Sequence, residues 1–367
     1  MNASLDKSEI LKWLQESNPE RLEELWRQAN ETRRRHVGDA VHLRGLIEIS
    51  NHCVRQCAYC GLRAGNQALS RYRMSADEIF VAALQAMRFG YGTVVLQAGE
   101  DFGISATWMT DVIRQIKAAT PLAVTLSLGE RSREELEAWR RAGADRYLLR
   151  FETSDRALFD AIHPGLGTGK SDRIALLRRL KKLGYETGSG IMVGLPGQTY
   201  QSVADDIALF RELDFDMIGI GPFIPHPATP LGAGDSGSKA SEVPDQAPNS
   251  ELMVYKAVAL TRLACPDANI PATTALATIN KINGRELGLR RGANVFMPNL
   301  TPLQYRRQYE IYPAKACIEE TGSACNSCLG SRINRIGRHV GRGPGGRHDR
   351  ASMSAAAASA TRGGCHV

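Results

Sequence analysis

Residues 93–151 carry the repeat that decides the fold, and they read TVVLQAGEDFGISATWMTDVIRQIKAATPLAVTLSLGERSREELEAWRRAGADRYLLRF. Short apolar runs, typical of buried strands, alternate here with stretches whose apolar residues recur at helical spacing. A strand, a helix and a second strand in this order favour a parallel sheet covered by helices. The alternation continues on both sides and predicts eight strands, at 45–50, 93–97, 123–127, 146–151, 186–193, 217–220, 269–272 and 294–297.

Eight strand–helix repeats favour an α/β fold whose sheet closes into a parallel (β/α)8 TIM-type barrel, which we place at residues 43–300. An open barrel of six strands with two extra elements is the alternative. Residues 1–42 are expected to form an N-terminal helical extension of two short helices. Residues 301–350 form a C-terminal segment with a second group of cysteines, and residues 351–367, which are low in complexity, are expected to be disordered.

Composition and charge exclude several classes of protein. Hydrophobic residues make up 43% of the chain, and no apolar run approaches the roughly 18–20 residues that cross a bilayer, so we expect no membrane association and a cytoplasmic location. The net charge of +7 would suit a nucleic-acid partner. Residues 332–367 hold seven Arg and a single acid, however, and no aromatic residue for stacking on bases. The rest of the chain is close to neutral, and we expect no nucleic-acid partner.

Three cysteines follow the first predicted strand, in the sequence SNHCVRQCAYCGLR. Cys53, Cys57 and Cys60 have the spacing C-x3-C-x2-C. Three thiolates can bind three irons of a [4Fe–4S] cube and leave the fourth iron open to a small molecule. A zinc site is the alternative, although zinc normally needs a fourth Cys or His nearby. Three buried cysteines without a metal fit this polar, glycine-containing loop poorly.

The spacing, with an aromatic residue at Tyr59 just before the third cysteine, resembles the signature of the radical S-adenosylmethionine (SAM) enzymes. The resemblance implies that the methionine end of SAM chelates the open iron. It also implies that an electron from the reduced cluster cleaves the sulfonium to a 5′-deoxyadenosyl radical. The cofactors would then supply the chemistry, while the protein orients them and excludes water.

Longer strings resemble the HydE-type maturases of [FeFe]-hydrogenase, a family related to biotin synthase. They fall in order between about residues 43 and 350 and read YRMSADEI, VLQAGED, TLSLGE, GADRYLLRFET, LGYETGSGIMVGLPGQT, DFDMIGIGPFIPHPATPL, NIPATTA and GANVFMPN. The resemblance implies a sulfur-bearing, organometallic small-molecule substrate on the path to the H-cluster. It also implies a ferredoxin or flavodoxin as electron donor and other hydrogenase maturation proteins as partners. The alternatives are a sister enzyme of amino-acid metabolism, similar to methylornithine synthase, and a zinc- or nucleic-acid-binding protein.

The resemblance also implies roles for individual residues. The residues expected to bind SAM are Tyr59, Gln97, Glu100, Glu152 and Arg173. Arg suits a carboxylate because its planar fork matches the two oxygens. From the sequence alone, a structural ion pair between Glu152 and Arg150 is an equally good interpretation. The residues expected to bind substrate are Arg63, Thr125, Thr273 and Thr274, and those expected near the reaction centre are Arg150, Tyr309 and Tyr312.

A second set of cysteines, Cys317, Cys325 and Cys328, has the spacing C-x7-C-x2-C. The resemblance implies an auxiliary [2Fe–2S] or [4Fe–4S] cluster there, with an empty site as the alternative. Phe151 replaces a His of some relatives. Neighbouring strand residues face opposite ways, so Phe151 should point away from Arg150 and serve packing.

Overall fold

The computed structural model describes residues 5–167, 169–233, 243–316, 318–319 and 322–347, and the helix backbone but not the side chains of 322–327. The tail expected to be disordered, residues 351–367, lies outside these ranges, as does Cys317. Within them, no helix is long and apolar enough to cross a lipid bilayer.

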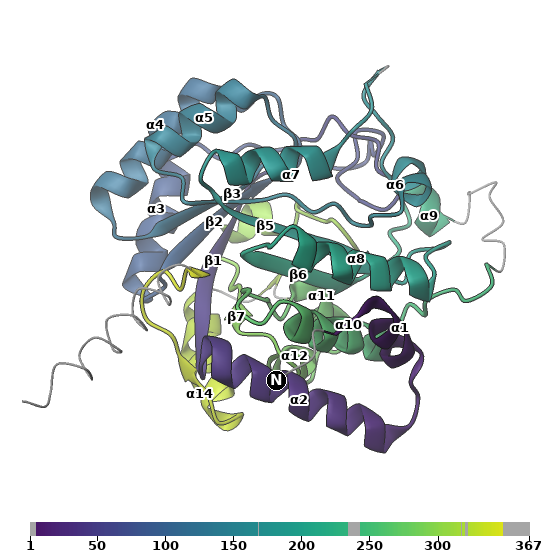
Figure 1. Cartoon of the computed structure of the whole chain (residues 1–367). Coiled ribbons are helices and arrows are strands. Elements are labelled where there is room, and N and C mark those ends of the chain that lie inside the picture. The colour runs from purple at the N-terminus through teal and green to yellow at the C-terminus, as the bar shows by residue number, and fades with distance from the viewer. Residues whose placement is uncertain (1–4, 168, 234–242, 317, 320–321, 348–367) are drawn as a thin grey trace, which may run out of the picture.

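Two helices precede the barrel, as predicted, and they pack on its outside. Helix α1 (Lys7–Gln15) lies against α8 (Tyr200–Glu212) and α10 (Glu251–Ala264), and α2 (Pro19–Val37) lies against α10 (Figure 1). With 19 residues, α2 is longer than the short helix expected. Lys256 of α10 fastens the α1–α2 turn by donating hydrogen bonds to the backbone oxygens of Leu14 and Glu16. The extension therefore supports one side of the barrel.

The predicted strands form one parallel sheet in the order β6-β5-β4-β3-β2-β1-β7. Neighbouring strands are paired in register, for example Arg44 with Thr93 and Thr125 with Arg146. The strands are β1 (Ala40–Ser50), β2 (Thr93–Ala98), β3 (Ala123–Ser127), β4 (Arg146–Leu148), β5 (Glu186–Val193), β6 (Met217–Pro222) and β7 (Val295–Phe296).

The sheet closes through residues 269–272, which were predicted as a full strand. They form only single parallel bridges, Asn269 with Met217 of β6 and Pro271 with Val295 of β7. Proline has no N–H to donate to a ladder, and the N–H of Ile270 goes to the side chain of Asn294 (2.9 Å). The prediction of a closed TIM-type barrel is confirmed. The prediction of a regular seventh strand is wrong, because Pro271 interrupts its hydrogen bonding.

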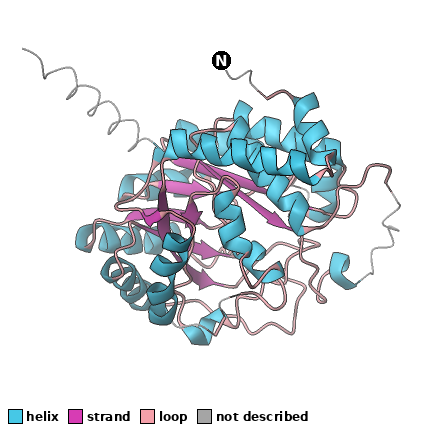
Figure 2. Ribbon diagram, turned by 90° about the horizontal axis from the view of Figure 1, so that it is seen from below, coloured by secondary structure: helices cyan, strands magenta, loops and turns pink. Residues whose placement is uncertain are grey.

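Helices surround the strands on several sides (Figure 2). Several begin at a Ser whose side chain accepts a backbone N–H, as Ser132 does for α5 (Arg133–Ala142). The helices not yet named are α3 (Ala76–Arg88), α4 (Ala106–Ala119), α6 (Arg156–Ile162), α7 (Arg173–Lys182), α9 (Pro230–Ala233), α11 (Thr274–Ile279), α12 (Gly284–Arg290), α13 (Leu303–Arg306) and α14 (Gly322–Arg335).

Alternate residues of each strand face the helices and the barrel interior. On β1, Leu43 and Ile47 belong to the apolar core, while Arg44 donates a hydrogen bond to the sulfur of Met217 on β6. Phe151 is buried against Phe210 and Phe215, whereas Arg150 contacts Glu152, so the packing role predicted for Phe151 is confirmed. The barrel thus has an apolar outer layer and a polar interior.

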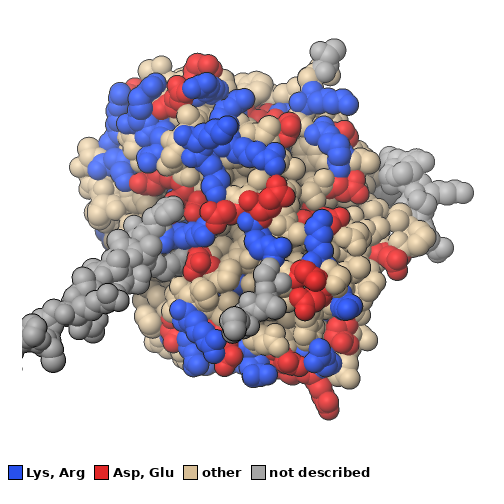
Figure 3. All heavy atoms as spheres, viewed as in Figure 1, with Lys and Arg blue, Asp and Glu red and all other residues tan. Residues whose placement is uncertain are grey.

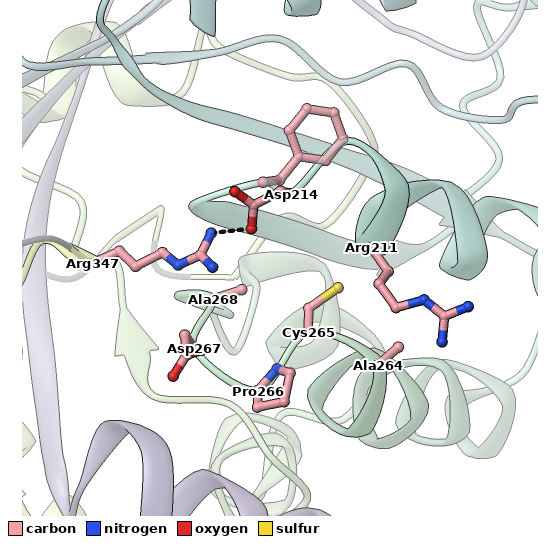
Figure 4. A pocket seen from close by; sticks show the side chains of 9 residues that line it. Arg211, Asp214, Ala264, Cys265, Pro266, Asp267, Ala268 and Arg347 are labelled. Atoms are coloured by element: carbon pink, nitrogen blue, oxygen red, sulfur yellow. Dashed lines mark hydrogen bonds and ion pairs between the residues drawn. The ribbon is translucent and has the colours of Figure 1, made fainter. Parts of the chain in front are cut away.

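The C-terminal segment crosses the barrel at the end where the strands begin. Its strand β8 (His339–Val340) pairs with the start of β1. Farther on, the Pro344 oxygen accepts a hydrogen bond from Thr93 (3.0 Å), and Arg347 forms an ion pair with Asp214 (2.6 Å), drawn in Figure 4. A cavity of about 190 Å³ beside Arg347 is lined in part by Cys265. This segment therefore covers the end of the barrel opposite the cysteines.

On the face shown in Figure 3, Lys and Arg side chains gather over α5 and α7, with Asp and Glu between them. Some cations of α5 and α7 have acidic partners, as in the pairs Arg133–Glu137 and Lys181–Asp214. The positive charge of this face is therefore partly neutralised by neighbouring carboxylates.

Candidate functional site

The loop after β1 brings the three cysteines to the carboxyl end of the barrel. Arg71 organises this loop, because its guanidinium donates hydrogen bonds to the backbone oxygens of Asn51, Leu62, Arg63 and Asn66. The backbone of the loop is tied to three other segments through the hydrogen bonds Val54 N to Glu100 O, Ala58 N to Ile162 O and Gly61 N to Ile311 O. The position of the cysteines is therefore set by the barrel as well as by their own loop.

The three thiols are close enough to influence one another, and none is in a disulfide. Burial raises the pKa of the Cys57 thiol to about 12, and burial and the other two cysteines also raise the pKa of Cys60. A thiol in this setting becomes a thiolate when a metal replaces its proton. The N–H of Glu100 already points at the sulfur of Cys53 (3.4 Å), as donors commonly do at iron-bound sulfur.

This arrangement fits a [4Fe–4S] cube. In the described part of the chain, no three His, Cys, Asp or Glu side chains are arranged to share one metal ion. A [4Fe–4S] cube does not need three side chains around one metal ion, because each cysteine binds a different iron atom. Three thiols outside any disulfide, one buried and two half-buried, in a loop that supplies backbone N–H donors meet that requirement.

A network of charged side chains adjoins the cysteines. Arg55 pairs with Glu100 (2.7 Å) and with Glu130 (2.9 Å), and Glu130 also pairs with Arg173 (3.1 Å). Burial opposes ionisation of Glu130, but its hydrogen-bonded partners and the two arginines outweigh burial and hold its pKa well below the usual range. For Glu100 burial prevails and raises the pKa. The network therefore combines the carboxylate of Glu130, which is firmly ionised, with that of Glu100, which is more readily protonated.

Glu152 adopts a backbone conformation that is unfavourable for a side chain with a Cβ. Its φ is 64°, in the left-handed region, and it follows the end of β4. The N–H of Glu152 bonds to the oxygen of Gly190 (3.0 Å), and the N–H of Met192 bonds to the oxygen of Glu152 (3.2 Å). Such strain persists only where the surrounding structure imposes it, often at functional sites. Glu152 also pairs with Arg150 (3.0 Å), so the ion pair considered from the sequence is present.

Arg173 points from the first turn of α7 into the same region. Its guanidinium donates to the oxygen of Arg150 (2.6 Å) and to Glu130, and it lies 3.2 Å from the Nε2 atom of His163. Tyr59 packs against the apolar cluster that contains Met192 and Phe223, and burial above all raises the pKa of its hydroxyl, with Cys57, Glu152 and Arg173 close enough to act on it. The residues expected to bind SAM, apart from Gln97, therefore gather beside the cysteines.

Gln97 and the two tyrosines have a different set of partners. Gln97 is a hydrogen-bond partner of the buried hydroxyl of Tyr309, and Tyr312 has Thr278 as its partner. Residues 309–312 lie outside any helix, so the two tyrosines do not share a helical face. Nearby, Lys315 forms an ion pair with Glu48 inside the barrel.

The residues expected to bind substrate are in three settings. Thr125 is 1% exposed, and its Oγ1 atom has no hydrogen-bond partner among the described residues. Thr273 caps α11, and the Thr274 hydroxyl accepts a hydrogen bond from Arg285 (3.1 Å). Arg63 lies in the cysteine loop, with its Nε atom buried and unpartnered in the described ranges. Among these four residues, Thr125 is therefore the one whose hydroxyl lacks a partner in the described part of the chain.

Comparison with known proteins identifies the family. Residues 47–210 match the family model of the Radical SAM superfamily. The [FeFe] hydrogenase maturase subunit HydE of Thermotoga maritima is 49% identical over 89% of this chain and 89% of that protein. This chain belongs to the HydE family of radical SAM enzymes. As a HydE-family member it is an iron–sulfur enzyme, and its family uses a [4Fe–4S] cluster and SAM.

More distant relatives are consistent with this placement. The 3-methylornithine synthase of Methanosarcina acetivorans is 28% identical over 75% of this chain and 74% of that enzyme, and biotin synthases also match. A crystal structure of methylornithine synthase has the same fold, with a TM-score of 0.77 and 24% identity over 96% of this chain and 97% of that one. The HydE relative is far more similar in sequence than either group.

Sequence reasoning did not assign a role to His163, Arg55 or Glu130. They come from the end of α6, from the cysteine loop and from the loop after β3, and the fold alone brings them together. Glu130 follows a strand end, which is the one signal that could have marked it. The second cysteine set is untested, because Cys317 and the side chain of Cys325 lie outside the described residues, while Cys328 is exposed on α14.

Proposed function

We propose that this enzyme acts on a sulfur-bearing, organometallic small molecule during assembly of the H-cluster of [FeFe]-hydrogenase. The observation that carries the proposal is the 49% identity to a HydE maturase, which extends over 89% of this chain. In this proposal residues 43–300 carry the radical chemistry, residues 1–42 support the barrel and residues 301–350 cover its end. Ferredoxin or flavodoxin would supply electrons, and other maturation proteins in the cytoplasm would exchange the substrate and product.

The cofactors would be held at the carboxyl end of the barrel. When bound, a [4Fe–4S] cluster and SAM supply the one-electron cleavage that gives a 5′-deoxyadenosyl radical. Cys53, Cys57 and Cys60 would hold the cluster. Arg173 and Glu152 would bind the charged groups of the methionine end, since a guanidinium and a carboxylate complement a carboxylate and an ammonium. Glu100 would bind alongside them, and Tyr59 would contact the adenine through its backbone.

The residues below the cofactors would receive the substrate. Thr125 offers a buried hydroxyl, and Gly219 on β6 leaves room in another part of the barrel wall, since a Cβ there would meet no described atom nearer than 3.8 Å. Thr273, Thr274 and Arg63 would contribute further polar contacts at the rim. Arg150, Tyr309 and Tyr312 would lie near the reacting atoms. Burial raises the pKa of both tyrosines, so each hydroxyl would keep its proton and serve as a hydrogen-bond donor.

Genetic complementation tests this function directly. We expect the gene for this chain to restore active [FeFe]-hydrogenase in a host that lacks HydE but has the other maturation proteins. The matched control is Cys57→Ala, which should not restore activity. If the wild-type enzyme cleaves SAM but fails to complement, the proposed function is wrong. Formation of 3-methylornithine by the purified enzyme would then support the alternative.

The second cysteine set would hold an auxiliary [2Fe–2S] or [4Fe–4S] cluster formed by Cys317, Cys325 and Cys328. Iron analysis of the Cys325→Ala variant tests this assignment. We expect it to bind less iron than the wild type by one cluster while still forming 5′-deoxyadenosine, and an unchanged iron content would rule the auxiliary cluster out.

A further inference from the structure

His163 lies between a cysteine of the site and Arg173, and the proposed function gives it no role. Its side chain is fully buried at the end of α6. The Nδ1 atom is 3.0 Å from the sulfur of Cys57, and Nε2 is 3.2 Å from the Nη2 atom of Arg173. Both nitrogens of the ring therefore face polar partners.

The backbone builds this approach. Ala58 follows Cys57 in the chain, and Ile162 precedes His163. The N–H of Ala58 donates a hydrogen bond to the backbone oxygen of Ile162 (2.8 Å). The ring of His163 also packs against Phe159, with 5.1 Å between the ring centroids. The cysteine loop and the end of α6 therefore hold the imidazole against the sulfur.

The neighbours decide which nitrogen of His163 carries the proton. Arginine only donates hydrogen bonds, so Nε2 must present its lone pair to Arg173, and the proton then lies on Nδ1. Glu130 Oε1 is also near Nε2 (3.3 Å), but it already accepts hydrogen bonds from Ser171 and from Nε of Arg173. With the opposite tautomer, two N–H groups would face each other at Nε2, and the Nδ1 lone pair would face the sulfur.

We propose that His163 donates its Nδ1–H to the sulfur of Cys57 when that sulfur is an iron ligand, and that Arg173 holds His163 in the required tautomer. Hydrogen bonds to cluster sulfurs and second-shell partners of metal ligands tune the potential of a cluster. A donor stabilises the more negative, reduced cluster more than the oxidised one, so this bond raises the reduction potential. His163 is thus a positioning residue that makes the cluster easier to reduce, and the inference rests on the proposed cluster.

Two variants separate the hydrogen bond from packing. His163→Leu removes the donor and keeps an apolar side chain, while His163→Asn keeps an N–H near the position of Nδ1. The measurement is an anaerobic potentiometric titration of the cluster without SAM, followed by electron paramagnetic resonance, with iron counted in each protein. For His163→Leu we expect roughly a tenfold lower ratio of reduced to oxidised cluster at a fixed potential, which corresponds to about 59 mV for one electron. His163→Asn should recover most of this loss.

A second measurement covers the case in which His163→Leu does not retain a cluster. Wild-type protein labelled with ¹⁵N-histidine should show coupling from a histidine nitrogen and from one exchangeable proton to the reduced cluster. A His163→Leu protein with full iron and the wild-type potential would overturn the inference, and so would absence of both couplings in the wild type. A wild-type protein that binds no iron at all would instead overturn the proposed cluster, and this inference with it.

Discussion

At the residue scale, two residues at the loop that follows β4 are held in costly states. Glu152 keeps a left-handed backbone conformation, and Asp206 on α8 keeps a carboxyl group that is fully buried. Asp206 accepts hydrogen bonds from the backbone and hydroxyl of Ser154, two residues after Glu152. These two residues therefore fix the loop that follows β4.

The strain at Glu152 can be measured with two substitutions. Glu152→Ala removes the carboxylate and keeps the strained backbone, whereas Glu152→Gly also relieves the strain. We expect Glu152→Gly to be more stable than Glu152→Ala by about 1 kcal/mol, because glycine adopts positive φ readily. Both should bind SAM at least about tenfold more weakly, the equivalent of one lost charge-assisted contact. Equal unfolding free energies for the two variants would contradict the assignment of strain.

Asp206 should make stability depend on pH. Burial raises its pKa to about 7, against hydrogen bonds that favour the charged form. The pKa of Asp206 is higher in the folded state than in the unfolded state. Its contribution to the free energy of unfolding is therefore complete below about pH 4 and is lost as the pH rises through 7. Between pH 5 and pH 8 the wild type should lose a few kcal/mol of stability through this group.

The Asp206→Asn variant is the control for this dependence, since it cannot ionise and keeps an oxygen for Ser154. Denaturant titrations at pH 5 and pH 8 should show a smaller difference for Asp206→Asn than for the wild type. If the two proteins have the same pH dependence, Asp206 is ionised in the folded state and its pKa is not raised.

At the element scale, the helices and the regular strands follow from periodicity, whereas the closing segment of the barrel does not. Hydrophobic patterning predicted β1–β6 because each is a short apolar run, and it could not show that Pro271 breaks the seventh run. The C-x3-C-x2-C spacing likewise predicts the cluster ligands, because they are local in sequence. His163 could not be found in this way, since it meets Cys57 only after α6 has packed against the cysteine loop.

The side chain of Asn294 replaces the missing ladder and should be important for closure. Its Oδ1 atom accepts hydrogen bonds from the N–H of Ile270 and from Arg262 (both 2.9 Å), and its amide donates to Asn269 (2.9 Å). Asn294→Ala would take this acceptor from the buried N–H of Ile270 and one hydrogen bond each from Arg262 and Asn269, and it should lower the free energy of unfolding by about 2–4 kcal/mol. Denaturant titration measures this loss.

The control for Asn294 is Asn334→Ala, because Asn334 is exposed on α14. This change should alter the unfolding free energy by less than about 0.5 kcal/mol. A loss at Asn294 no larger than that at Asn334 would show that the barrel closes without the side chain.

At the scale of the whole molecule, the two ends of the barrel have different coverings. The cysteine loop lies at the carboxyl ends of the strands, and the segment after β8 crosses the opposite end. Most of the net positive charge lies beyond residue 331, and its arginines include Arg347, which is paired with Asp214. In the part of the tail that the structure describes, Arg347 therefore fastens the chain to its own barrel.

Gly92 tests the seating of this segment. A Cβ at Gly92 would lie 1.7 Å from the backbone oxygen of Gly343, and neither backbone can yield easily. Gly92→Ala should therefore displace the segment and destabilise its attachment to the barrel by roughly 1.4 kcal/mol. Tryptic cleavage after Arg342 and Arg347 should then be about tenfold faster or more. Gly330→Ala, where a Cβ would contact no described atom, is the control. Equal cleavage rates for the two variants would show that the segment is not held by this contact.

The central claim is that Cys53, Cys57 and Cys60 hold the cluster that cleaves SAM. The most direct test is anaerobic reconstitution with iron and sulfide, reduction by a one-electron donor and measurement of 5′-deoxyadenosine formed from SAM. We expect product from the wild type and none above background from Cys57→Ala. A brown, iron-containing wild type that forms 5′-deoxyadenosine supports the claim, and a Cys57→Ala protein that forms it at the wild-type rate would contradict the claim.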